Sequence, residues 1–97
     1  MKTYLLFLLF TLTLIGCGRA DYTGTVFGVK HFTRGGVAVD MDGAYPNQKM
    51  TLYVSASDEA RVGRLPPVGA TVTATGAATE YKGRPEIKIH SKDQWKW

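Results

Sequence analysis

Length, charge and cysteine content narrow the class of protein before any motif is considered. The chain has 97 residues, with 12 Lys and Arg against 8 Asp and Glu, a formal net charge of +4 and one Cys. A chain this short has room for one domain with a modest core, which excludes a multidomain enzyme. A hydrophobic content of 44% and a charged content of 21% argue against wholesale disorder and against a polytopic membrane protein. The one Cys excludes a framework of internal disulfides.

The first sixteen residues have the pattern of a secretory signal. Lys2 precedes an apolar run, residues 4–15, which Gly16 ends. The run is shorter than the ~20 apolar residues that a spanning helix usually needs. A positive charge before a short apolar run is typical of a signal peptide. We therefore expect residues 1–16 to be removed from the mature chain.

The end of the apolar run, Leu14-Ile15-Gly16-Cys17, resembles the lipobox of bacterial lipoproteins. The resemblance implies that diacylglycerol alkylates the Cys17 thiol, that the signal is cut before Cys17, and that the new amino group is acylated with a fatty acid such as palmitate. Such acyl chains hold a protein on a lipid bilayer. The alternative is an ordinary signal peptide with an incidental Cys. Gly18 stands where Asp would retain an enteric-type lipoprotein on the inner membrane, so the expected location is outside the cytoplasm, on the outer membrane facing the periplasm.

Residues 22–97 are predicted to form an all-β domain, with residues 17–21 as the lipidated tether. Thr, Val, Tyr and Gly dominate, and no stretch repeats its apolar residues with the period of a helix. Five strands are predicted, at residues 22–33, 36–42, 50–56, 70–81 and 85–90. Gly24 and Gly28 interrupt the first strand, as glycines at bulges and bends do. Residues 57–65 predict one helical turn capped by Ser57.

Five strands with a linking segment between the third and the fourth form the pattern of the OB-fold, a Greek-key barrel. Several segments also resemble the nucleic-acid-binding OB-fold family with the anticodon-binding type of domain. They are Gly24-Thr25-Val26, Met50-Thr51-Leu52-Tyr53-Val54, residues 67–76 and Tyr81-Lys82-Gly83-Arg84-Pro85-Glu86-Ile87-Lys88-Ile89. The resemblance extends over about residues 22–95. It implies binding of single-stranded nucleic acid or of a similar anionic polymer, such as an anionic glycan.

The resemblance also implies where the ligand would bind. In OB-folds, ligands lie across the second and third strands and between the loops that join strands one to two and four to five. On this chain that surface holds aromatic and basic residues, namely Lys30, Phe32, Arg34, Tyr53, Tyr81, Lys82, Arg84 and Lys88, with His31 and His90 beside them. Bases stack on aromatic rings while cations follow phosphates, which suits single-stranded nucleic acid. The competing interpretation of each residue is an ordinary solvated strand face.

The sequence is compatible with several classes of binding partner. A modest positive charge attracts lipopolysaccharide phosphates and anionic lipids as well as nucleic acid. A lipoprotein outside the cytoplasm meets envelope proteins more often than nucleic acid, and OB-folds serve several kinds of recognition. The alternative function is an envelope module, from a bacterium, a phage or a plasmid, that contacts another protein and binds no nucleic acid.

Nothing in the sequence predicts catalysis, a cofactor or a metal site. Neither His has a Ser or Cys nucleophile at a recognisable spacing. The thiol of Cys17 is expected to be bonded to the lipid, so it is not a free nucleophile. Asp40 and Asp42 precede Gly43 as in part of a calcium loop, but the later ligands of such a loop are missing. Strand alternation predicts that these two carboxylates are solvated on one outward face. Trp95 and Trp97 are expected to cap the barrel mouth or to contact a partner.

Overall fold

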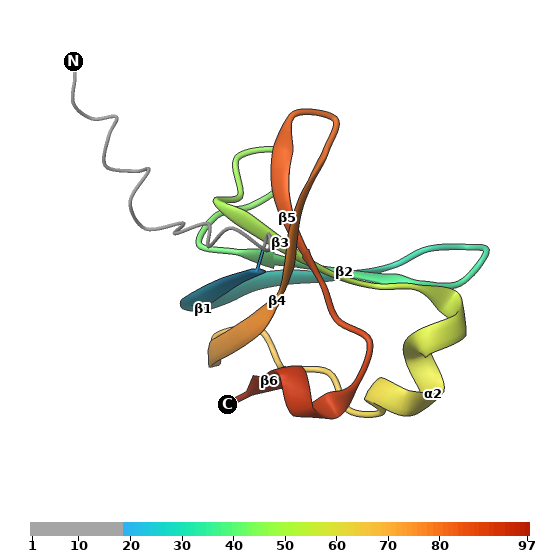
Figure 1. The fold of residues 1–97 in the computed structure, drawn as a ribbon. Helices are drawn as coiled ribbons and strands as arrows, with labels where there is room; N and C mark the ends of the chain where they lie inside the picture. The colour runs from blue at the N-terminus through green and yellow to red at the C-terminus, as the bar shows by residue number, and fades with distance from the viewer. Residues whose placement is uncertain (1–18) are drawn as a thin grey trace, which may run out of the picture.

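Strands make up most of the computed structural model, which describes residues 19–97 (Figure 1). In chain order the elements are β1 (Arg19–His31), β2 (Val37–Met41), β3 (Met50–Val54), the 3-10 helix η1 (Ala56–Asp58), α2 (Glu59–Val62), β4 (Thr71–Tyr81), β5 (Arg84–Lys88), the 3-10 helix η2 (Lys92–Gln94) and β6 (Trp95–Lys96). The predicted signal peptide and Cys17 lie outside the described residues. Between residues 19 and 97 no helix is both long and apolar enough to cross a bilayer.

β1 is a long strand that pairs with a different neighbour in each half. Residues 19–25 pair antiparallel with β4, and residues 26–31 pair antiparallel with β2. The register shifts between Val26 and Gly28, and such a bulge bends a strand and increases its twist. The predicted interruption at Gly28 is therefore confirmed, whereas Gly24 pairs in regular register with Val72 of β4. The strand begins at Arg19 rather than at the predicted Tyr22, because residues 19–21 of the predicted tether already pair with β4.

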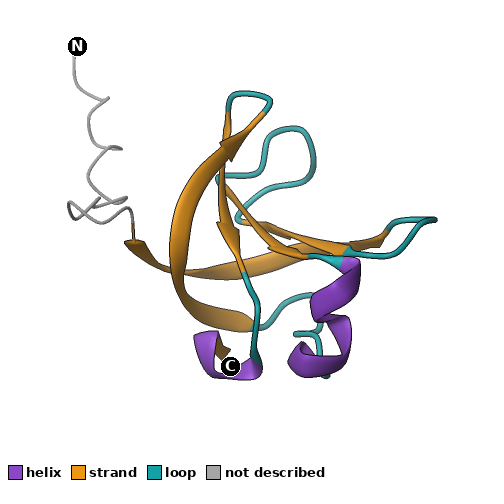
Figure 2. Cartoon of the chain, turned by 45° about the vertical axis from the view of Figure 1, so that its right-hand side comes forward, coloured by secondary structure: helices purple, strands orange, loops and turns teal. Residues whose placement is uncertain are grey.

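The strands β1 to β5 close into a barrel (Figure 2). Their order is β1-β2-β3-β5-β4, and β4 pairs back onto β1. β3 and β5 run parallel, whereas the other pairs of the ring run antiparallel. The predicted all-β, five-stranded barrel is confirmed. Placing the fifth strand between the third and the fourth gives a Greek-key connection that is compatible with the OB-fold.

Side chains that alternate along the strands fill the barrel. The predicted inward faces are buried, including Val37, Val39, Met41, Met50, Leu52, Val54, Val72, Ala74, Ile87 and Ile89. Each Val, Leu, Ile or Met side chain buried in this way contributes about 1.5–3 kcal/mol relative to an exposed one. The opposite side chains of the same strands point outward, and those of β2, β3 and β5 form the site described below.

Short helical segments and a sixth strand cover one end of the barrel (Figure 1). Val62 of α2 is buried in the core. Trp95 of β6 is also buried and pairs with Ala74 of β4, so the expectation that it caps the barrel is confirmed. The predicted helix cap at Ser57 is wrong, because Ser57 lies inside η1 and the helical turns begin after Ser55 and Asp58.

Candidate ligand-binding groove

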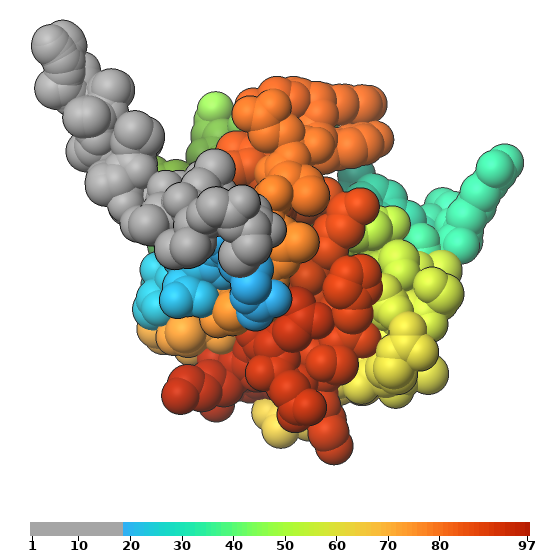
Figure 3. Space-filling view, in the orientation of Figure 1, coloured from blue at the N-terminus to red at the C-terminus, as the bar shows by residue number. Residues whose placement is uncertain are grey.

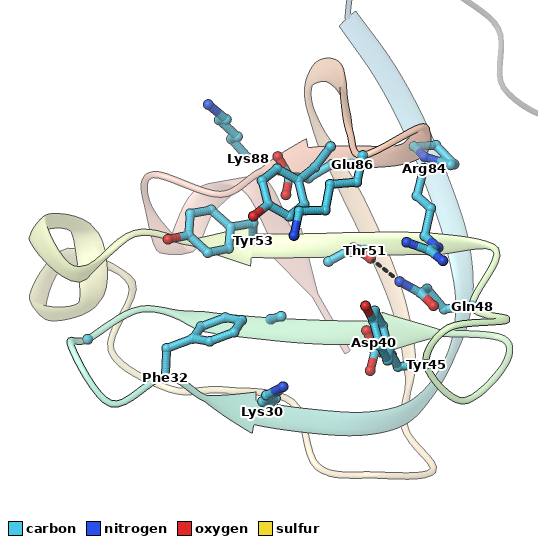
Figure 4. Close-up of a pocket in the computed structure, with 15 residues that line it drawn as sticks. Lys30, Phe32, Asp40, Tyr45, Gln48, Thr51, Tyr53, Arg84, Glu86 and Lys88 are labelled. Atoms are coloured by element: carbon cyan, nitrogen blue, oxygen red, sulfur yellow. Dashed lines mark hydrogen bonds between the residues drawn. The ribbon is translucent and has the colours of Figure 1, made fainter.

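A groove of about 650 Å³ crosses the outward face of β2, β3 and β5 (Figure 4). Loops β1–β2 and β2–β3 and the β4–β5 hairpin border it. In Figure 3 the hairpin, in orange, and the β1–β2 loop, in turquoise, project from the body of the molecule with a hollow between them. The lining residues are Lys30, Phe32, Gly35, Ala38, Asp40, Tyr45, Gln48, Thr51, Tyr53, Tyr81, Lys82, Arg84, Pro85, Glu86 and Lys88.

The strand register arranges the floor of the groove in two rows. Asp40 of β2 lies opposite Thr51 of β3, and Thr51 lies opposite Glu86 of β5. One step along the strands, a second row holds Lys30, Ala38, Tyr53 and Lys88. Both rows face outward because successive side chains of a strand point to opposite faces. One row therefore presents oxygen atoms, and its neighbour presents cations and an aromatic ring.

Cations lie over aromatic rings along the borders of the groove. The Lys30 ammonium is 5.4 Å from the ring centroid of Phe32 and 5.9 Å from that of Tyr45. The Arg84 guanidinium carbon is 5.3 Å from the Tyr45 ring centroid. Phe32 and Tyr53 are tilted neighbours with centroids 6.4 Å apart. These separations lie within the ~6 Å range of a cation–π attraction and the ~7 Å range of an aromatic pair.

The hairpin places the cations of one border. Lys82 (φ 53°) and Gly83 (φ 81°) both have left-handed backbone angles, as the two-residue turn of a tight hairpin requires. The Lys82 ammonium lies 5.4 Å from the ring centroid of the exposed Tyr81. The Arg84 Nε donates a hydrogen bond to the Pro46 carbonyl oxygen at 3.2 Å. This bond holds the β2–β3 loop against the hairpin.

Two carboxylates lie among the four cations of the groove. Partial burial raises the pKa of Asp40, and the nearby positive charge of Lys30 acts in the opposite direction. The Glu86 side chain is buried and accepts a hydrogen bond from the Thr79 hydroxyl at 3.3 Å. The Gln48 amide nitrogen donates to the Thr51 hydroxyl at 3.0 Å, and its buried Oε1 has no hydrogen-bond partner in the described part of the chain. The net charge of the groove is positive, but its floor is not uniformly so.

The structure brings together almost all the ligand-binding residues predicted from the sequence. Lys30, Phe32, Tyr53, Tyr81, Lys82, Arg84 and Lys88 line the groove. Arg34 does not, because it lies exposed in the β1–β2 loop. His31 and His90 also lie outside the groove, and the His90 ring bonds to Asp58 instead.

Sequence reasoning missed five important lining residues, namely Asp40, Tyr45, Gln48, Thr51 and Glu86. Alternation could have identified Thr51 and Glu86, since both lie on outward faces beside chosen residues. Tyr45 belongs to a loop and gave no such signal. Asp40 and Asp42 were expected on one face, and this is wrong. Asp42 has a φ of 56° and accepts hydrogen bonds from the Tyr22 hydroxyl and from the Thr25 N–H.

The groove combines three kinds of binding group. It offers ring faces for stacking, cations for ion pairs, and oxygen atoms on its floor for polar groups. Residues 19–97 contain no cluster of three or more His, Cys, Asp or Glu that could hold a metal ion. No protein-family model matches this chain, and no curated protein matches its sequence.

Proposed function

We propose that this chain is a lipoprotein, anchored to the outer membrane through acylated Cys17, whose barrel is an OB-fold that binds single-stranded nucleic acid or a similar anionic polymer. The ligand lies in the groove across β2 and β3. The observation that carries the proposal is the pairing of cations with aromatic rings on both borders of that groove. A separate charge patch or a separate aromatic patch would not favour a polymer that has both phosphates and flat bases.

The exposure of the aromatic rings supports stacking. Tyr45 is 63% exposed and Tyr81 is 61% exposed, so large parts of both rings are available to a ligand. Base stacking on such a ring contributes about 1–3 kcal/mol per base. Lys30, Lys82 and Lys88 line the same groove, where their ammonium groups can pair with the phosphates between stacked bases. An anionic glycan would use the same cations but would gain less from the tyrosine rings.

A contact with an envelope protein is the second candidate function. Phe27 is 56% exposed and Val68 is 65% exposed, and neither lines the groove. They belong to neighbouring backbone segments, because the Gly69 N–H donates to the Val26 carbonyl oxygen at 2.8 Å. Exposed apolar side chains of this kind suit a protein partner.

The first test is binding of a fluorescent oligothymidine to the full chain in nonionic detergent, measured across a salt series. We expect binding that weakens as salt rises, with the logarithm of the association constant falling by about 0.7 per phosphate contact for each tenfold rise in salt. Replacing two groove cations, Lys82→Gln with Lys88→Gln, is expected to weaken binding and to reduce that slope by about 1.4.

The matched control replaces Lys92 and Lys96 by Gln. Both lysines are exposed and lie outside the groove. Their replacement removes the same positive charge as the groove variant. Equal weakening by the two double variants would contradict the groove as the binding site. Absence of binding at low salt by both oligothymidine and oligodeoxycytidine would contradict nucleic-acid binding. Crosslinking through Phe27 and Val68 would then test the protein partner, and lipopolysaccharide binding would test the glycan.

A further inference from the structure

The floor of the groove presents acceptors where a general phosphate-binding surface would present donors. Asp40, Thr51 and Glu86 lie in one row across three strands (Figure 4), and neighbouring strands are about 4.8 Å apart. A chain of phosphates along this row would face two carboxylates. The cations lie in the next row and on the borders, so phosphates and the acceptor row are kept apart.

The two carboxylates differ in their availability to a ligand. Glu86 is 8% exposed and already accepts a hydrogen bond from the Thr79 hydroxyl. Asp40 is half-buried and lines the groove. Its carboxylate receives no side-chain or loop hydrogen bond from residues 19–97, and its pKa is raised by burial. A partly desolvated acceptor without a donor is stabilised when a ligand supplies one.

We propose that Asp40 makes the groove prefer bases that carry an exocyclic amino group, cytosine first, over thymine. The proposal rests on the proposed function, since it names the bases that the same groove selects. The N4 amino group of cytosine is a donor that Asp and Glu side chains accept in base recognition. Thymine has the acceptor O4 at the same position, and this oxygen repels the Asp40 carboxylate.

The surroundings of Asp40 allow a base to reach it while its phosphate stays on the cations. Lys30 acts on Asp40 by its charge, and its ammonium lies over the Tyr45 ring. The Arg84 guanidinium also lies over this ring. A base that displaces one of these cations from the exposed Tyr45 ring leaves that cation for a phosphate and has the Asp40 acceptor at the floor of the groove. This arrangement separates the roles of the residues, because the cations bind any strand and Asp40 selects the base.

The experiment compares oligodeoxycytidine with oligothymidine of equal length on the full chain in nonionic detergent, at pH 7.5 and fixed salt. The measured quantity is the ratio of the two dissociation constants, in which general electrostatic attraction cancels. We expect the wild type to bind oligodeoxycytidine roughly tenfold more tightly. Asp40→Asn is expected to bring the ratio close to one, because an amide accepts from cytosine and donates to thymine.

Asp93→Asn is the matched control, since Asp93 is exposed in η2, outside the groove, and its loss changes the charge equally. It is expected to keep the wild-type ratio. The thermal midpoint of each variant verifies folding, and Asp40→Ser replaces Asp40→Asn if the latter does not fold. A wild-type ratio near one, or a ratio unchanged by Asp40→Asn, overturns the role of Asp40 while the proposed function stands. Failure of both oligonucleotides to bind overturns the proposed function itself.

Discussion

Asp58 is a buried carboxylate that joins two segments distant in the sequence. Its Oδ2 accepts hydrogen bonds from the His90 ring at 2.7 Å and from the Ser55 hydroxyl at 2.9 Å. Its Oδ1 accepts one from the Arg61 guanidinium. Asp58 thereby ties the helical segment after β3 to the segment after β5. Three donors on one carboxylate favour its charged form.

The His90 bond, the Ser55 bond and the Arg61 bond together lower the pKa of Asp58 from 3.8 to about 2, although burial opposes this shift. Because the folded pKa is below the unfolded one, Asp58 stabilises the fold above pH 3.8, and this stabilisation is lost as the pH falls through about 2. Asp58→Asn is expected to lower the Tm at pH 7. Thermal denaturation across the acidic range should show the two Tm values converging. A gap that is constant down to pH 2 would contradict the role of the charge, and Asp93→Asn should leave the neutral-pH Tm unchanged.

Residues of the groove could be predicted from the sequence where a strand fixes their direction. Alternation with the buried Leu52 and Ile87 places Tyr53 and Lys88 on the outward face, and the structure agrees. Tyr45 could not be placed in this way. Its position depends on the path of the β2–β3 loop, which is held by the bond from Arg84 to Pro46 between residues far apart in the sequence. Local sequence does not encode such a contact.

β4 passes close to its neighbours at Gly76. A Cβ atom there would lie 2.9 Å from Cγ2 of Ile87, 2.9 Å from the Lys88 carbonyl oxygen and 2.7 Å from Nε2 of Gln94. The same Gln94 nitrogen donates to the Thr75 and Lys88 carbonyl oxygens, so it cannot move away without losing both bonds. We expect Gly76→Ala to destabilise the barrel by roughly 1–3 kcal/mol, which lowers the Tm of a domain of this size by at least about 4 °C.

Gly28→Ala is the control for this substitution. Gly28 also lies within a strand, but a Cβ there would meet only Asp40 Oδ2, at 3.9 Å. An alanine at a compatible backbone position restricts the unfolded chain and is neutral or stabilising. Thermal denaturation of both variants checks the pair of expectations. Equal Tm values would contradict a close contact at Gly76.

Elements with a clear period of two were predictable, and those held by tertiary contacts were not. The interior residues of β2, β3, β4 and β5 follow alternation, whereas a bulge interrupts β1, so these four strands differ from prediction mainly at their ends. β6 is two residues long and exists because Trp95 is buried beside β4. The helical segment begins after Ser55 and not at Ser57, and neither helical turn has a side-chain cap. Asp58 is held there partly by His90, which is distant in the sequence and which a local cap signal does not reveal.

At the scale of the whole molecule, a lipid on Cys17, as we propose, would lie close to the barrel. One residue, Gly18, separates Cys17 from Arg19, where β1 begins, and the two chain steps between them span at most about 7 Å. Arg19 pairs with Ala77, and the antiparallel β4 runs on to Tyr81 beyond that pairing. The β4–β5 hairpin, with Lys82 at its turn, therefore extends past the start of β1. An anchored barrel would hold this border of the groove near the head groups, where anionic lipids compete for its cations.

The position of the hairpin near the head groups depends on a lipid anchor at Cys17. Intact-mass measurement of the protein purified from membranes tests whether Cys17 carries this lipid. We expect the wild-type chain to begin at Cys17 and to carry acyl groups. Cys17→Ser is expected to retain residues 1–16 and to carry no lipid, since a hydroxyl does not supply the thioether. Its barrel should keep the wild-type Tm, because every described strand pairing starts at or after Arg19. Thr11→Ser, a similar change before the lipobox, should be processed normally. A wild-type chain with an unmodified Cys17 would contradict the lipobox and remove the constraint on the orientation of the groove.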